Sequence, residues 1–119
     1  MDTATSTVLQ ITKLNPKLFP NDMNFSQNSK YLAIGFASQL VKILTVETLK
    51  ETHQYQHSAP VRKVEWNPNS EMLQVISSDF NRQIIVFDYI ANKVVGRVEG
   101  GVTFCFTSDG NKIITIYDQ

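Results

Sequence analysis

The apolar residues of the chain fall into short runs and do not follow a helical period. The runs are rich in Val, Ile, Phe and Tyr, and Asn, Asp, Ser, Pro and Gly separate them. This pattern is typical of short strands joined by turns. The clearest runs are 31–37, 40–46, 61–66, 73–77, 83–89, 94–98, 102–106 and 112–117, and weaker ones cover 8–13 and 50–55. We therefore predict an all-β protein.

A turn sequence recurs along the chain at a nearly constant interval. Phe25, Trp66 and Phe106 each stand at the expected end of a strand, and each is followed by residues that favour tight turns. The intervals are 41 residues (66 − 25) and 40 residues (106 − 66). A period of roughly 40 to 45 residues with four strands in each period predicts a β-propeller.

These repeats resemble those of the WD-repeat (WD40) family. The segment 106–110, Phe-Thr-Ser-Asp-Gly, is similar to the family's Phe-Ser-Pro-Asp-Gly turn. Phe87-Asp88 stands where the family has Trp-Asp, and His57 stands nine residues before Trp66, where the family places the His of Gly-His. The resemblance covers residues 23–117 and implies a partial WD40-type propeller of about two and a half four-stranded antiparallel blades.

The repeats divide the chain into four parts. We expect an N-terminal segment at 1–22 with an outer closing strand, blade 1 at 23–56, blade 2 at 57–99, and the first two strands of an incomplete blade 3 at 100–119. A propeller typically has four or more blades, because each blade needs a neighbour to cover its faces. We therefore expect part of a larger protein, a truncated product, or a subunit completed by self-association or by a partner.

The resemblance also implies a structural network inside blade 2. His57, Ser78, Asp79 and Phe87 stand where the family has its His, Ser, Asp and Trp. Phe87 lacks the indole N–H donor, so the network cannot be complete. The simpler interpretation is that these residues pack and cap turns.

Loops on one rim of the propeller are the candidate binding site. In the family, the loops between second and third strands and those between blades share a rim. Gln39, Phe80 and Arg82 would lie there, and Phe and Arg are enriched at protein interfaces. The alternative is that Phe80 folds back onto its blade and Arg82 is solvated.

Other chemistry has weak support. Cys105 with His57 and an Asp would suit nucleophilic catalysis, but no nucleophile signature surrounds Cys105, and we expect it to be a small buried residue. His53 and His57 have i, i+4 spacing without a Cys partner nearby, and the glycines at 96, 100 and 101 precede no Gly-Lys-Ser/Thr. We predict no catalytic residue, metal or cofactor.

Charge and composition restrict the partners. The 11 basic and 11 acidic residues give zero formal net charge, which argues against direct nucleic-acid binding. No apolar run approaches the roughly 20 residues of a membrane-spanning helix. The single cysteine cannot form an internal disulfide, so we expect a cytoplasmic or nuclear protein.

These features predict a non-catalytic protein-interaction scaffold. Within the WD-repeat proteins, the chain is similar to the centrosomal and spindle-pole family encoded antisense to a p53-family gene, through residues 30–33, 40–41, 46–49, 64–66 and 108–110. That similarity implies anchoring of microtubule minus ends, with a coiled-coil anchoring protein and a minus-end kinesin as partners. The alternatives are a scaffold in RNA processing or ribosome assembly, a fragment without independent function, and an enzyme with a polar cluster in the central channel, which the sequence does not show.

Overall fold

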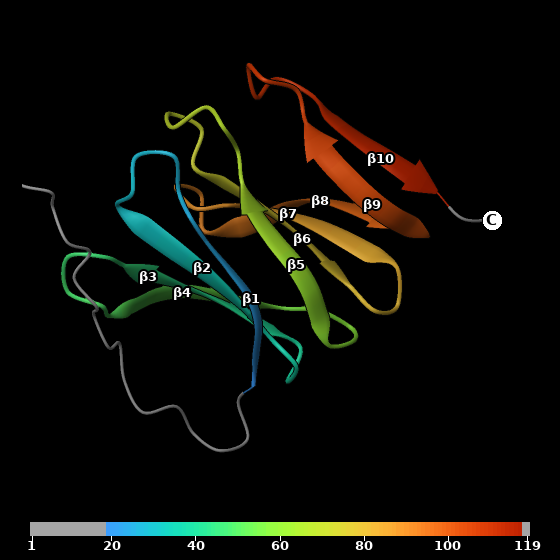
Figure 1. Ribbon diagram of the computed structural model, residues 1–119, viewed down its shortest axis with the longest axis horizontal. Coiled ribbons are helices and arrows are strands. Elements are labelled where there is room, and N and C mark those ends of the chain that lie inside the picture. The colour runs from blue at the N-terminus through green and yellow to red at the C-terminus, as the bar shows by residue number, and fades with distance from the viewer. Residues whose placement is uncertain (1–18, 118–119) are drawn as a thin grey trace, which may run out of the picture.

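The computed structural model describes residues 19–117, and these residues form ten strands in three antiparallel sheets (Figure 1). The strands are β1 (Pro20–Phe25), β2 (Tyr31–Phe36), β3 (Leu40–Thr45), β4 (Glu51–Gln56), β5 (Val61–Trp66), β6 (Gln74–Asp79), β7 (Gln83–Asp88), β8 (Lys93–Glu99), β9 (Gly101–Phe106) and β10 (Ile113–Tyr117). The sheet orders are β1-β2-β3-β4, β5-β6-β7-β8 and β10-β9. No helix among residues 19–117 is long and apolar enough to cross a membrane.

The three sheets are arranged as blades of a propeller. Figure 1 shows β1 of the first sheet beside β5 of the second sheet, with the β9–β10 hairpin on the other side of the second sheet. Blade 1 (β1–β4) and blade 2 (β5–β8) are complete, and the β9–β10 hairpin packs on blade 2 in the position of a third blade. The structure therefore confirms the predicted fold class, a partial propeller of about two and a half blades.

The repeated turn closes in the same way in each sheet. In each turn, the backbone N–H of the residue that follows the aromatic donates to a backbone carbonyl where the next strand begins. The pairs are Ser26 to Tyr31 at 2.8 Å, Asn67 to Gln74 at 2.8 Å and Thr107 to Lys112 at 2.9 Å. Gly110 has a φ of 76° in the third turn, and Ser29 has a φ of 61° in the first. The sequence period is therefore a structural period of one blade.

The main hydrophobic core lies between blades 1 and 2. Its buried members come from both blades and include Val41 and Ile43 on blade 1 and Val61, Val64 and Val75 on blade 2. Gly35 on β2 makes this packing possible, because a Cβ atom there would lie 2.4 Å from Cγ1 of Val61. The two blades are packed so closely that this position has no room for a side chain.

A row of aromatic rings extends along the same interface, with members taken alternately from blades 2 and 1. Neighbouring ring centroids lie between 4.0 and 6.0 Å apart, so each ring contacts the next. In order, the rings are Trp66, Tyr31, Tyr89, His53, Phe87 and Tyr55. His53 therefore takes part in packing, stacked on Tyr89 at 4.0 Å.

A second core joins blade 2 to the hairpin. Ile76, Ile84 and Phe104 are buried together there, and a Cβ at Gly101 would lie 2.4 Å from Cδ1 of Ile84. The side-chain amide of Asn67 donates to the backbone carbonyl of Gly110 at 2.9 Å. The hairpin is thus attached both by apolar packing and by a buried hydrogen bond.

Strand β1 differs from the expected strands, since no apolar run predicts it. It contains Asn21, Asp22 and Asn24, and it begins at Pro20, so blade 1 starts before the expected boundary at residue 23. Two of these polar residues bind the backbone of β5 in blade 2. Asn21 Nδ2 donates to the Val61 carbonyl, and Asp22 accepts from the Val64 N–H, both at 2.9 Å. The predicted outer closing strand at 8–13 lies outside the described residues.

Candidate functional site

Four loops gather at one rim of the blades. They are residues 37–39 between β2 and β3, 57–60 between β4 and β5, 80–82 between β6 and β7, and Gly100 between β8 and β9. The backbone N–H of His57 donates to the Gln39 carbonyl at 2.7 Å, and that of Phe80 donates to the Pro60 carbonyl at 3.1 Å. The β2–β3 turn and the β6–β7 turn are therefore both hydrogen-bonded to the loop 57–60, which connects blade 1 to blade 2. We call these four loops the rim.

Gln39 and Arg82 occupy equivalent places in two similar turns. Each is the last residue of a three-residue loop, and each has a positive φ, 79° for Gln39 and 61° for Arg82. Each backbone N–H donates back to the end of the preceding strand, at Phe36 and Asp79 respectively. This left-handed conformation is unfavourable for a residue with a Cβ, so the surrounding hydrogen bonds must hold it. Arg82 is exposed and Gln39 is half-buried.

Phe80 extends from the rim toward solvent. Its side chain is 64% exposed, and the Arg62 guanidinium carbon lies 6.0 Å from the centre of its ring. The structure therefore does not show Phe80 folded back onto its blade. A large exposed aromatic held on a short, hydrogen-bonded loop is a suitable anchor for a partner protein.

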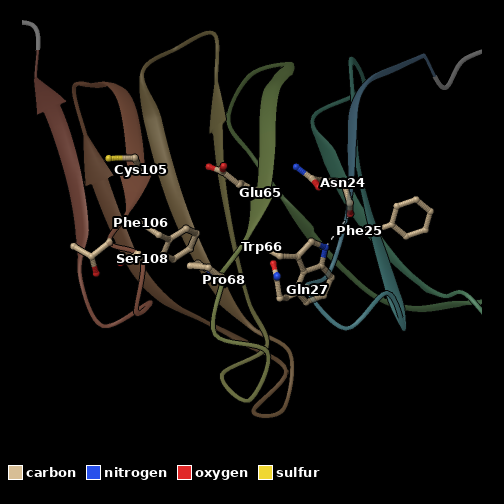
Figure 2. A pocket seen from close by; sticks show the side chains of 10 residues that line it. Asn24, Phe25, Gln27, Glu65, Trp66, Pro68, Cys105, Phe106 and Ser108 are labelled. Carbon is tan, nitrogen blue, oxygen red and sulfur yellow. Dashed lines mark hydrogen bonds between the residues drawn. The ribbon is translucent and has the colours of Figure 1, made fainter.

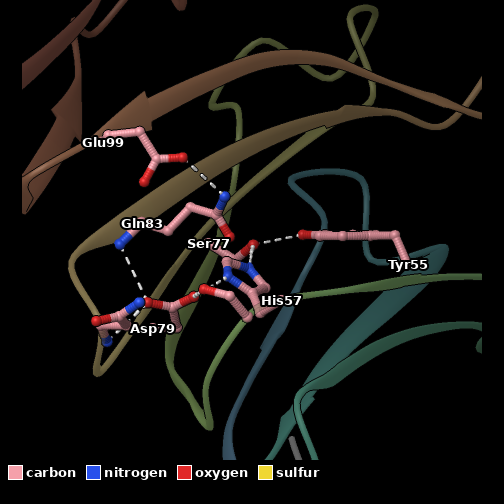
Figure 3. A network of polar contacts seen from close by, with 8 residues as sticks. Tyr55, His57, Ser77, Asp79, Gln83 and Glu99 are labelled. Atoms are coloured by element: carbon pink, nitrogen blue, oxygen red, sulfur yellow. Dashed lines mark hydrogen bonds and ion pairs between the residues drawn. The ribbon is translucent and has the colours of Figure 1, made fainter.

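Beneath the rim lies a buried polar network (Figure 3). Asp79 Oδ2 lies 3.0 Å from His57 Nδ1, and His57 Nε2 lies 2.7 Å from Ser77 Oγ. The Tyr55 hydroxyl lies 2.6 Å from the same Ser77 oxygen. The other carboxylate oxygen of Asp79 accepts the backbone N–H groups of Asn81 and Gln83 at 2.8 and 3.0 Å. The network therefore fixes the loop that carries Phe80.

The network differs from the expected one at two of its four positions. His57 and Asp79 are brought together, but Ser77 takes the place expected for Ser78, which is buried on the opposite face of β6 because side chains alternate along a strand. Phe87 makes no hydrogen bond to the network, and its ring stacks on Tyr55 with centroids 4.6 Å apart. The Tyr55 hydroxyl, from β4 of blade 1, thus supplies the donor that Phe87 lacks.

The environment keeps His57 neutral at neutral pH. Burial lowers the pKa of His57 below its usual value of 6.5, Arg97 lowers it further, and Asp79 acts in the opposite direction. With Asp79 as acceptor, Nδ1 carries the proton and Nε2 accepts from Ser77. The Ser77 oxygen then accepts from Tyr55, and burial raises the pKa of that phenol. Every donor in the chain therefore has an acceptor.

Ser77, His57 and Asp79 have the order and spacing of a hydrolytic triad. The relative exposure of Ser77 is 0%, and its hydroxyl is already engaged by Tyr55. A substrate carbonyl cannot reach this oxygen without opening the interface between the blades. The geometry therefore favours a structural role for the network.

The structure supports neither a catalytic role for Cys105 nor the burial expected of its side chain. It is exposed on β9, because residues 103 and 105 face away from the core that buries Phe104. His57 is buried and occupied by Ser77 and Asp79, and the structure does not bring it to Cys105. Among residues 19–117, no group of three His, Cys, Asp or Glu side chains could hold a metal ion.

A pocket of about 370 Å³ opens on the innermost strands (Figure 2). Its walls come from equivalent positions of the three repeats: Asn24, Glu65 and Cys105 form one row, and Phe25, Trp66 and Phe106 form the next. Gln27, Pro68, Thr107 and Ser108 complete the lining. No histidine lines it, so Cys105 has no imidazole partner there.

The fold of the described residues is that of a partial WD40-type propeller. No family model matches the chain. Component of gems protein 5 from Dictyostelium discoideum is 28% identical over 82 residues, which cover 65% of this chain and 6% of that protein. A chain in a crystal structure of the mitotic checkpoint complex, a WD40 propeller, has a TM-score of 0.75 and 21% identity, with 88% of this chain and 33% of that chain covered.

The matches support a WD-repeat interpretation of the sequence. This chain spans only a small part of the curated relative, and only a third of the solved chain. Neither match is to the centrosomal family that the sequence resembles, so that finer assignment stays a prediction.

Proposed function

We propose that this chain is a non-catalytic scaffold that binds other proteins through the rim. The observation that carries the proposal is the exposed Phe80, held on a loop that Asp79 and the Pro60 carbonyl fix from below. Binding sites in proteins are often loops positioned by a rigid framework. The names of the two similar proteins, a component of gems and a member of a checkpoint complex, agree with a role in assemblies.

Affinity capture with rim variants tests this proposal. Tagged wild-type chain, Phe80→Ala and Gln39→Ala would be used to capture proteins from cell extract, with Ile90→Ala as the matched control. Ile90 is 70% exposed but lies in the β7–β8 turn, away from the rim. We expect the captured proteins to be lost with the rim variants and kept with Ile90→Ala. Capture that is insensitive to both rim changes would contradict the proposal.

The finer proposal is that the scaffold acts at centrosomes or spindle poles and anchors microtubule minus ends. It rests on the resemblance described above, and its expected partners are a coiled-coil anchoring protein and a minus-end kinesin. Imaging of the tagged chain should show it at spindle poles in the cytoplasm, and the chain should co-sediment with microtubules when these partners are added. A uniform distribution through mitosis would contradict it.

The second candidate is a scaffold in RNA processing or ribosome assembly. It rests on the resemblance to the WD-repeat proteins, many of which serve as scaffolds there. Capture of ribonucleoprotein subunits in the rim experiment, with no microtubule association, would favour it over the centrosomal role.

We also propose that the exposed face of the β9–β10 hairpin is covered in the working assembly. Either a second copy of this chain or further blades would cover it. Ile114 and Ile116 on β10 are both more than half exposed, on the same side of the strand. Light scattering on the purified chain distinguishes the two, because self-association gives a dimer or trimer mass and cover by other blades leaves a monomer.

A further inference from the structure

The three arginines of the chain, Arg62, Arg82 and Arg97, all belong to blade 2 near the rim. Arg62 is the second residue of β5, which begins at the rim. Arg82 lies in the β6–β7 loop. Arg97 lies on β8, two residues before Glu99 at the end of that strand. Glu99 pairs with Gln83, the residue that follows the β6–β7 loop, so this end of β8 is at the rim. All three side chains are exposed.

The carboxylates of this region are already engaged. Asp79 is buried, and its oxygens bind His57 and the N–H groups of Asn81 and Gln83. Glu99 accepts the side-chain amide of Gln83 at 3.1 Å. Glu99 remains exposed and negatively charged, because an amide donor does not neutralise a carboxylate, but Arg62 and Arg97 outnumber it among the exposed charges around Phe80.

The opposite end of the blades has a different charge pattern. Its turns and the strand ends beside them carry five acidic residues and four lysines: Glu47, Glu51, Glu71, Asp88 and Asp109 with Lys30, Lys50, Lys93 and Lys112. The zero net charge of the chain thus conceals a cationic rim. Arginine differs from lysine in presenting a planar set of donors that matches a carboxylate.

We infer that the rim of blade 2 binds an acidic extended segment of a partner protein. A leucine or similar side chain of that segment packs on Phe80, and carboxylates on either side of it meet the guanidinium groups of Arg62 and Arg97. The 6.0 Å contact between Arg62 and the Phe80 ring holds this guanidinium beside the apolar anchor. The inference rests on the proposed function and adds the chemistry of the partner.

The charge of the chain favours an acidic protein over a nucleic acid. Binding to a phosphate backbone requires a broad basic surface that displaces counterions. Here the whole chain is neutral, and the cationic region is limited to one rim around an exposed ring. A short acidic segment with one apolar residue matches a region of that size.

Fluorescence anisotropy with labelled peptides tests the inference. The probe is a glutamate peptide with one central leucine, and its controls are the same peptide with glutamine in place of glutamate, with lysine in place of glutamate, and with glycine in place of leucine. We expect the glutamate-leucine peptide to bind at least about tenfold more tightly than each control, and its affinity to fall with added salt. Equal binding of the glutamine peptide, or no binding of any peptide, would overturn the inference.

Variants locate the site on the full chain. Phe80→Ala and Arg62→Gln should each weaken binding by about tenfold, as for anchors of an interface. Ile90→Ala and Lys93→Gln, at the opposite end, are the matched controls and should bind as wild type. Circular dichroism checks that each variant is folded. Equal losses with the control variants would place binding elsewhere and overturn the inference.

The remaining outcomes separate this inference from the proposed function. Tighter binding of a labelled oligouridylate than of the acidic peptide would replace the acidic partner with RNA. Failure of the peptides, together with rim-dependent capture of proteins, would reject the acidic chemistry and leave the scaffold. Capture that is independent of the rim would reject the proposed function itself.

Discussion

The hydroxyl of Tyr55, on the last strand of blade 1, lies 2.6 Å from Oγ of Ser77, on the second strand of blade 2. This hydrogen bond connects the two blades and completes a chain that continues through His57 to Asp79. Asp79 in turn fixes the backbone of the loop that presents Phe80. The contact between the blades is thus linked to the geometry of the rim.

Removal of the Tyr55 hydroxyl should weaken this link. In Tyr55→Phe, Ser77 loses its buried donor while the stacking on Phe87 is kept, and we expect the free energy of unfolding to fall by about 1 to 2 kcal/mol. Urea unfolding followed by circular dichroism measures the change. Tyr89→Phe is the matched control, because its hydroxyl is not part of the buried network and contacts Thr52 at 3.3 Å and Tyr31. An equal loss in the control would contradict a special role for Tyr55.

The stability should depend on pH through His57. Its pKa is lowered in the folded chain, so below the usual value of 6.5 the unfolded chain binds the proton more readily. The free energy of unfolding should therefore be constant above this pH and fall as the pH decreases through about 6.5 toward the folded value. Urea unfolding between about pH 5 and pH 8 measures the slope. His57→Gln should lose stability at neutral pH and also lose most of this slope. A wild-type slope that persists in His57→Gln would assign the effect to another group.

The sequence predicts the blades better than it predicts the side-chain pairs. The near-constant interval between Phe25, Trp66 and Phe106 is a property of one blade, so the fold class follows from it, and the rim loops follow from the resemblance to the WD-repeat family. The repeat places the end of strand β1 at Phe25, but no apolar run marks the rest of this strand. Its Asn and Asp side chains bind the β5 backbone, and this source of stability leaves no apolar pattern.

The network shows a limit of a different kind. Ser77 and Ser78 are adjacent and chemically identical, and only the register of β6 determines which one faces His57. Tyr55 lies two residues before His57 and supplies the hydroxyl donor from the neighbouring blade. The resemblance to the family implies a donor at position 87 instead, where this chain has a Phe that only packs.

The close packing of blades 1 and 2 predicts a strong difference between two glycines. In Gly35→Ala the new methyl would meet Val61 at 2.4 Å in a full core, and we expect a loss of about 1 to 3 kcal/mol in the free energy of unfolding. Gly96→Ala is the control, because its Cβ would lie at an ordinary 3.7 Å from Val86. Thermal unfolding of both variants tests this, and Val61→Ala in the Gly35→Ala background should recover part of the loss. Equal unfolding temperatures for the two glycine variants would contradict the packing described for Gly35.

Asn67 should control the attachment of the β9–β10 hairpin. Its side-chain amide donates to the Gly110 carbonyl at 2.9 Å and to Gln74 at 3.1 Å, and its oxygen accepts the Asn69 N–H at 2.8 Å. In Asn67→Ala the buried Gly110 carbonyl loses this donor, at a cost of about 1 to 3 kcal/mol. Amide hydrogen exchange should therefore become faster in β9 and β10 while β2 and β3 keep their protection. Asn69→Ala, which removes only an exposed turn contact with Glu71, is the control and should leave exchange in the hairpin unchanged. Faster exchange throughout all three sheets of Asn67→Ala would show that the hairpin unfolds together with the blades, and would contradict a local role for this side chain.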